Sequence, residues 1–192
     1  SLLLKNNLLY STLNRGFLSR TGNYINFNNI IATPTSSNNG HIKNLITVKK
    51  YFSGNNSIYG IHGKIGNIFS LNNNDILTDD KFSLGGRSLR GFDVYGAGPR
   101  NSRTSYIGGN NLAVLKLDYS YEITRKSDFP LLLNIFNDYG LIWENKTTPT
   151  QSDNNIRSSV GFGIRYYSPV GPIGFTWGFP IMDEEYDIKR MF

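Results

Sequence analysis

The strongest local signal in this chain is a period-two alternation of apolar and polar side chains. Over residues 112–124 one parity is apolar and carries Ala113, Leu115, Leu117, Tyr119, Tyr121 and Ile123. The other parity carries Lys116, Asp118, Ser120, Glu122 and Thr124. The same alternation returns in 157–167 and 173–179. Successive side chains of a β-strand point to opposite faces, so each stretch predicts a strand with one apolar and one polar face.

The alternation predicts strands along nearly the whole chain. We expect them at about 2–12, 23–33, 42–52, 57–68, 110–124, 131–143, 156–168 and 172–181, with a further start near 188. The pattern is blurred at 2–11 and 42–52. Strands of about ten residues can cross a bilayer when tilted, whereas globular strands are commonly about five or six residues long. The expected fold class is therefore all-β, an antiparallel transmembrane β-barrel.

The links between the expected strands fall into two length classes. The short links are 53–56, 125–129 and 169–171. The long links, rich in Asn, Ser, Thr or Gly, are 34–41, 69–109 and 144–155. Outer-membrane barrels have short periplasmic turns and longer external loops, and the two classes alternate here from the third strand onward. The link 13–22 is an exception, because it is long although it falls on the side where short periplasmic turns are expected.

A soluble antiparallel barrel is the alternative that shares this alternation, with its apolar parity turned inward. The composition does not decide between the two, since 39% hydrophobic residues suit both. The chain has no cysteine, which excludes disulfides and thiolate metal sites within it. The formal net charge of +6 is scattered along the sequence, so we expect no nucleic-acid partner.

Short motifs carry a resemblance to a known family. Gly85-Gly86-Arg87-Ser88-Leu89-Arg90-Gly91-Phe92, followed by Gly98-Pro99-Arg100, resembles the signature of the long sixth external loop of BamA-type outer-membrane assembly factors. Segments on both sides resemble the same family in the same order: 13–17 with 21–22, 108–110 with 113–114, 136–140 with Trp143, 167–172, and 175–180. Six segments over nearly the whole chain are far more specific than one tripeptide.

The resemblance implies an architecture. Residues 1–192 would be a partial C-terminal barrel domain holding about eight strands of a sixteen-stranded barrel, with a long external loop at about 69–109. Periplasmic POTRA domains and the first half of the barrel would precede Ser1. Tyr186–Phe192 would lead into the last strand. We therefore expect the chain to be a fragment.

The loop motif predicts an ion-paired site. Glycines Gly85 and Gly86 precede Arg90, and Gly91-Phe92 follow it, so the backbone can turn tightly and place the guanidinium inside the barrel. Asp118 and Asp138 lie on the polar parities of two expected neighbouring strands, where a forked guanidinium can bind both. The resemblance implies this same contact. The alternative is two separately solvated carboxylates and a solvated loop arginine.

We expect no catalytic residues, no metal site and no cofactor. His41 and His62 are the only histidines, and no nucleophile-elbow pattern accompanies them. Asp79-Asp80 and Glu184-Glu185 are expected to be solvated loop charges. Asp75 to Asp80 lacks the glycine and the terminal glutamate of a calcium loop, and no Gly-Lys-Ser/Thr follows Gly86.

The implied function is the folding and insertion of outer membrane proteins in the bacterial outer membrane, by templating strands at a barrel seam. The implied partners are nascent outer membrane proteins, outer membrane lipid and accessory assembly lipoproteins. Two alternatives stay open: a secretion transporter of the same superfamily that exports a passenger protein, and a simple diffusion porin.

Overall fold

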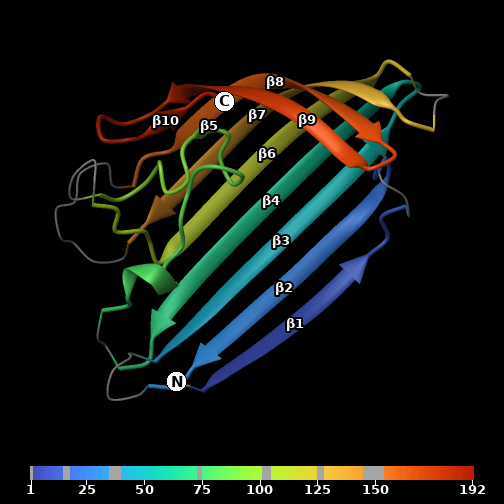
Figure 1. Ribbon diagram of the computed structural model, residues 1–192. Helices are drawn as coiled ribbons and strands as arrows, with labels where there is room; N and C mark the ends of the chain where they lie inside the picture. Colours follow the sequence, from blue (N-terminus) through green and yellow to red (C-terminus); the bar gives the residue numbers. More distant parts are fainter. Residues whose placement is uncertain are drawn as a thin grey trace.

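The computed structural model describes residues 2–14, 18–34, 40–72, 75–100, 105–124, 128–144 and 154–192. These ranges contain one eight-stranded antiparallel sheet and one two-stranded sheet. The strands of the large sheet are β1 Leu3–Ser11, β2 Gly22–Ala32, β3 His41–Ser53, β4 Ser57–Ser70, β6 Asn111–Glu122, β7 Leu131–Trp143, β8 Arg157–Ser168 and β9 Gly171–Met182. They pair in chain order as a meander, and β1 and β9 are the two open edges (Figure 1).

The observed strands confirm the expected fold class and lie within two residues of every expected boundary. The main strands are nine to fourteen residues long. The two stretches with a blurred pattern, β1 and β3, are continuous strands because each pairs along its length with β2. Backbone pairing thus completes strands that side-chain alternation alone marks weakly.

The two faces of the sheet differ as the alternation predicts. On β6 the apolar parity is open, with Leu115 42% and Leu117 40% exposed, while Asp118 and Lys116 lie on the covered face. On β8 and β9, Phe162 and Phe175 are about half exposed. Their rings stack with that of Trp177, but on the open face and not in a closed core. A soluble barrel would have buried this parity, so that alternative is wrong.

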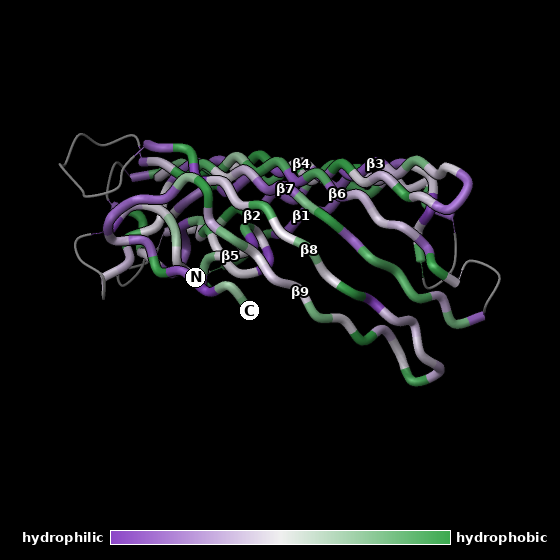
Figure 2. Tube along the Cα trace, turned by 90° about the horizontal axis from the view of Figure 1, so that it is seen from above, coloured by the Kyte–Doolittle hydropathy of each residue, from purple (hydrophilic) through white to green (hydrophobic). Residues whose placement is uncertain are grey.

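The chain between β4 and β6 folds over the polar face of the sheet. It contains the 3-10 helix η1 Thr78–Asp80 and the short strand β5 Gly91–Phe92. β5 packs against β9 and β8 of the large sheet, and Figure 2 shows it on the same side of the sheet toward which β8 and β9 bend. This arrangement places the sequence motif inside the curve of the sheet.

A small apolar core lies under this loop, where the sequence predicted only a wet, polar wall. Six loop side chains and their strand partners are buried together: Ile68, Ile76, Phe82, Leu84, Leu89, Phe92, Ala97, Leu112, Val114 and Ile142. The prediction failed here because the polar parities are not polar throughout. Leu112 and Val114 share the parity of Asp118, and they form an apolar platform toward one end of β6.

The C-terminal residues make a contact that the sequence did not predict. The expected strand start near 188 is present as β10 Lys189–Arg190, but it pairs with β5 of the loop. Among the described residues, the structure contains no helix that is both long and apolar enough to cross a membrane.

Candidate functional site

Arg90 binds both predicted carboxylates. Its Nε and Nη2 donate to Asp138 Oδ2 and Oδ1, at 2.7 Å and 2.5 Å, and its Nη1 donates to Asp118 Oδ1 at 2.8 Å. The backbone N–H of Arg90 donates a further hydrogen bond to Asp138 Oδ2 at 3.2 Å. Asp138 is fully buried, whereas the side chain of Asp118 is 20% exposed. The guanidinium therefore makes its bidentate pair of hydrogen bonds with Asp138, the more desolvated of the two acids.

The strand register explains how two aspartates serve one arginine. Lys116 lies directly opposite Asp138 across the β6–β7 pair, and Asp118 lies opposite Phe136. The two carboxylates are therefore diagonal neighbours on one face, close enough for a guanidinium to bridge them. The short side chain of Asp118 is long enough to reach Arg90 from this diagonal position.

Two further residues complete the site, and the sequence analysis gave them no role in it. The Arg90 guanidinium lies 3.6 Å from the centre of the Phe136 ring. Lys116 Nζ donates to the Arg87 carbonyl at 2.8 Å and lies 3.7 Å from Asp138 Oδ2. Phe136 and Lys116 share the parities of Asp138 and Asp118, so parity was the signal that could have found them.

The electrostatics keep Arg90 charged. Burial acts to lower the pKa of Arg90, but hydrogen bonds and charge from Asp138 and Asp118 outweigh it and raise the pKa above its ordinary value. Two carboxylates in this position repel each other unless a cation lies between them. Arg90 and Lys116 together supply two positive charges to the two aspartates, so the site is balanced.

The predicted glycines shape the loop around Arg90. Gly85 has φ +125°, and a Cβ there would lie 2.0 Å from the Asp93 carbonyl oxygen. Gly86 donates its N–H to the Phe92 carbonyl at 2.9 Å, which closes the turn that carries Arg90. Gly91 has φ +89° and lies against Gly178 of β9. Phe92 is buried in the loop core.

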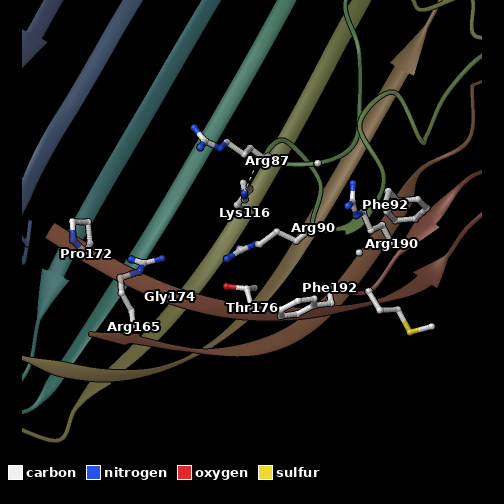
Figure 3. Close-up of a pocket in the computed structure, with 14 residues that line it drawn as sticks. Arg87, Arg90, Phe92, Lys116, Arg165, Pro172, Gly174, Thr176, Arg190 and Phe192 are labelled. Atoms are coloured by element: carbon white, nitrogen blue, oxygen red, sulfur yellow. Dashed lines mark hydrogen bonds between the residues drawn. The ribbon is translucent and has the colours of Figure 1, made fainter. Parts of the chain in front are cut away.

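A cavity of about 650 Å³ lies beside this site, between the loop, the wall and the C-terminal residues. Figure 3 shows the residues that line it. Its cationic side chains come from four parts of the chain: Arg87, Arg90, Lys116, Arg165 and Arg190. The arrangement holds a loop and offers a positive, water-accessible space, but it does not pair a nucleophile with a base.

Other charged residues lie differently from the prediction. His41 was expected in a polar loop, but it begins β3, is buried, and lies 3.8 Å from Asp80. Glu184 accepts a hydrogen bond from Asn155, so it is not simply solvated. Within the described ranges no three His, Asp or Glu side chains form a cluster suited to a metal ion. Arg15 to Phe17 of the first motif segment lie outside the described residues.

Comparison with known proteins gives consistent matches. A family model described as the Omp85 superfamily domain matches residues 1–192. The outer membrane protein assembly factor BamA of Nitratidesulfovibrio vulgaris strain Hildenborough is 28% identical over 159 residues, which are 81% of this chain and 20% of that protein. A SAM50-like protein of Schizosaccharomyces pombe is 30% identical over 137 residues, which are 68% of this chain and 29% of that protein.

A solved structure matches the fold. The crystal structure of BamA from Haemophilus ducreyi lacking POTRA domains 1–3 superposes with a TM-score of 0.84 at 23% identity. The match covers 99% of this chain and 41% of that one. The chain therefore spans well under half of the length of each relative and structure that it matches here.

Proposed function

The chain belongs to the Omp85 superfamily, and on that premise we propose that it is part of a bacterial outer-membrane β-barrel that folds and inserts other outer membrane proteins. The names of the relatives support this function, since one is an outer membrane protein assembly factor. The observation that carries the proposal is the tethering of Arg90 to Asp118 and Asp138, which fixes a long loop on the inner face of a membrane-type sheet.

The proposed architecture extends beyond this chain. Residues 1–192 would form the C-terminal part of a sixteen-stranded barrel, with the loop at about 69–109 on the external side and POTRA domains upstream. The match to 41% of a BamA chain that lacks three POTRA domains is in keeping with this arrangement. The open apolar parity, with residues such as Leu117 and Phe175, would face outer membrane lipid.

The proposed mechanism is strand templating at a seam of the barrel. An unpaired strand edge recruits other strands, and unpaired backbone groups are especially costly in lipid. A weak seam could therefore pair with an incoming strand of a nascent outer membrane protein by β-augmentation. The tethered loop would hold the barrel interior in the state that supports this pairing. The folding free energy of the client would drive insertion, so no cofactor is required, and accessory assembly lipoproteins would assist.

Reconstitution of the full-length protein tests this function. Purified protein in liposomes should speed the folding of an unfolded outer membrane protein, followed as the heat-modifiable band on a gel. Arg90→Ala should lower the rate about tenfold, within the range of coupling energies between distant sites. Lys50→Ala, which removes a cation from β3 outside the Arg90 contacts, should leave the rate unchanged.

The alternatives give different results in the same liposomes. A secretion transporter would release a passenger protein across the bilayer without speeding the folding of a barrel client. A diffusion porin would admit small solutes and do neither. Either result, obtained with a folded full-length protein, would replace the proposed function.

A further inference from the structure

The residues after β9 turn back and join the loop that carries Arg90. In the two-stranded sheet, Lys189 pairs with Phe92 and Arg190 with Gly91. The contact continues beyond these pairs, because Asp93 N donates to Ile188 O at 2.9 Å and Ile188 N donates to Gly96 O at 2.8 Å. The C-terminal segment, defined here as residues 183–192, is thus held by the backbone of the loop.

The same segment runs back along the free edge of β9. Gly178 N donates to Met191 O at 2.9 Å. The Phe192 ring lies 5.7 Å from that of Trp177 and 6.3 Å from that of Phe175, centre to centre. The residue numbers rise along the segment as they fall along β9, so the segment begins an antiparallel pairing with this edge. The position of the C-terminal segment therefore decides which residue of β9 is the first to pair with it.

A buried ion pair fixes the turn that precedes this pairing. Arg157, the first residue of β8, donates from Nε to Asp187 Oδ2 at 3.0 Å, and both side chains are fully buried. Asp187 Oδ2 also accepts a hydrogen bond from Glu184 N at 2.9 Å, and Asp187 N donates to Glu184 O at 3.0 Å. One carboxylate therefore closes the 184–187 turn and binds it to the wall.

The residues around Arg157 hold its side chain and the turn together. Its Nη1 donates to the Asn155 carbonyl at 2.6 Å, and Asn155 Nδ2 donates to Glu184 Oε1 at 2.7 Å. Both ends of the turn are thus tied to the residues around the start of β8. Asp187 Oδ2 accepts from both Arg157 Nε and Glu184 N, so removal of this buried contact from either side should loosen the turn.

We propose that Arg157 and Asp187 form a clasp that positions the C-terminal segment between the Arg90 loop and the free edge of β9. The clasp holds the 184–187 turn, the turn sets the register of Lys189 and Arg190 on β5, and that register places Met191 opposite Gly178. Arg157 and Asp187 are positioning residues that act through the segment. If the protein inserts barrels as proposed above, the clasp links the loop to the start of the last strand, which borders the seam.

Disulfide trapping in the full-length, membrane-inserted protein tests the clasp. The chain has no cysteine, so Asp93→Cys with Ile188→Cys reports the loop–segment contact one residue beyond the Phe92–Lys189 pair. Oxidation should join the two cysteines rapidly in the parent. Arg157→Gln should slow this cross-linking about tenfold, and Asp187→Asn should slow it equally. The variant with both changes should be no slower than either one alone, because each removes the same contact.

Lys50→Gln is the control, because Lys50 is an exposed cation on β3, outside the Arg90 contacts. Its cross-linking rate should equal that of the parent. Parent-like cross-linking in folded Arg157→Gln and Asp187→Asn would overturn the clasp. If Arg157→Gln does not fold, Asp187→Asn decides, since Asp187 lies outside the strands. If neither folds, the pair supports the whole wall and the positioning role is wrong.

This readout is independent of the proposed function. The cross-linking rate is measured without a client protein, so a barrel that inserts nothing can still show the clasp. Conversely, a protein that inserts clients normally but cross-links at the parent rate in both variants would leave the function standing and remove the clasp.

Discussion

The backbone of Gly91 in the loop contacts the backbone of Gly178 in β9 so closely that a side chain at either position would be strained. A Cβ on Gly178 would lie 2.6 Å from Gly91 N, and a Cβ on Gly91 would lie 3.1 Å from the carbonyl carbon of Gly178. Because Gly91 directly follows Arg90, this contact sets how far the Arg90 backbone lies from the inner face of the large sheet.

Gly178→Ala should therefore loosen the loop. The added methyl group meets backbone that cannot rotate away, so we expect a cost of about 1–3 kcal/mol to the docked loop. Hydrogen–deuterium exchange of the amides in 84–97 measures this as faster exchange in the full-length protein. Gly174→Ala is the control, because a Cβ there meets its neighbours at ordinary distances of 3.4 Å or more. Equal exchange in both variants would show that the glycine contact does not hold the loop.

Alkaline pH should release the loop through Tyr106. Burial raises the pKa of Tyr106 to about 12, and its hydroxyl accepts a hydrogen bond from Leu84 N at 3.2 Å. A tyrosine in an unfolded loop ionises near pH 10. Between these values the docked loop binds more protons than the released one, so its stability is complete below about pH 10 and falls as the pH rises through about 12.

The expected loss is about 3 kcal/mol over this interval. A fluorophore on Arg87→Cys, at an exposed loop position, follows release during an alkaline titration. Tyr106→Phe cannot ionise there, so its titration should lose this transition even though the loop is weaker at neutral pH. An unchanged transition in Tyr106→Phe would assign the release to another group.

The two faces of β9 should contact different surroundings. Phe175 is 53% exposed on the open face, and Thr176 lines the cavity beside Arg90. A bimane label at Phe175→Cys should be quenched several-fold more by spin-labelled lipid than by a water-soluble quencher. The same label at Thr176→Cys should show the reverse order. Equal quenching at the two positions would contradict a membrane-facing apolar parity.

The positions of the strands could be predicted from the sequence because most segments carry their own alternation of apolar and polar residues. Pairing with neighbouring strands then completes the segments in which the alternation is weak. The sequence was also sufficient for Arg90, Asp118 and Asp138, since the motif supplied the arginine and parity supplied the face. The contact between the Phe136 ring and Arg90 depends on the β6–β7 register, which alternation does not specify.

Other contacts depend on tertiary structure alone. Asp187 lies in a segment with little pattern, and nothing near it in sequence indicates that it meets Arg157. The contact of Gly91 with Gly178 likewise joins residues far apart in the chain, although each glycine is ordinary in its own segment. These contacts depend on how the loop packs against several strands together, and the local sequence around each residue does not specify that packing.

Exchange of the loop amides in Arg90→Ala, Asp138→Asn, Asp118→Asn and the Arg90→Ala/Asp138→Asn double variant tests the tethered loop most directly. Asp138→Asn should weaken the docked loop by about 3–5 kcal/mol because its acid is fully buried. Asp118→Asn should cost about 1 kcal/mol, since that acid is partly exposed and binds one nitrogen. The double variant should destabilise the docked loop no more than the more destabilising of the two single changes does. Parent-like protection of 84–97 in all four variants would show that Arg90 does not hold the loop.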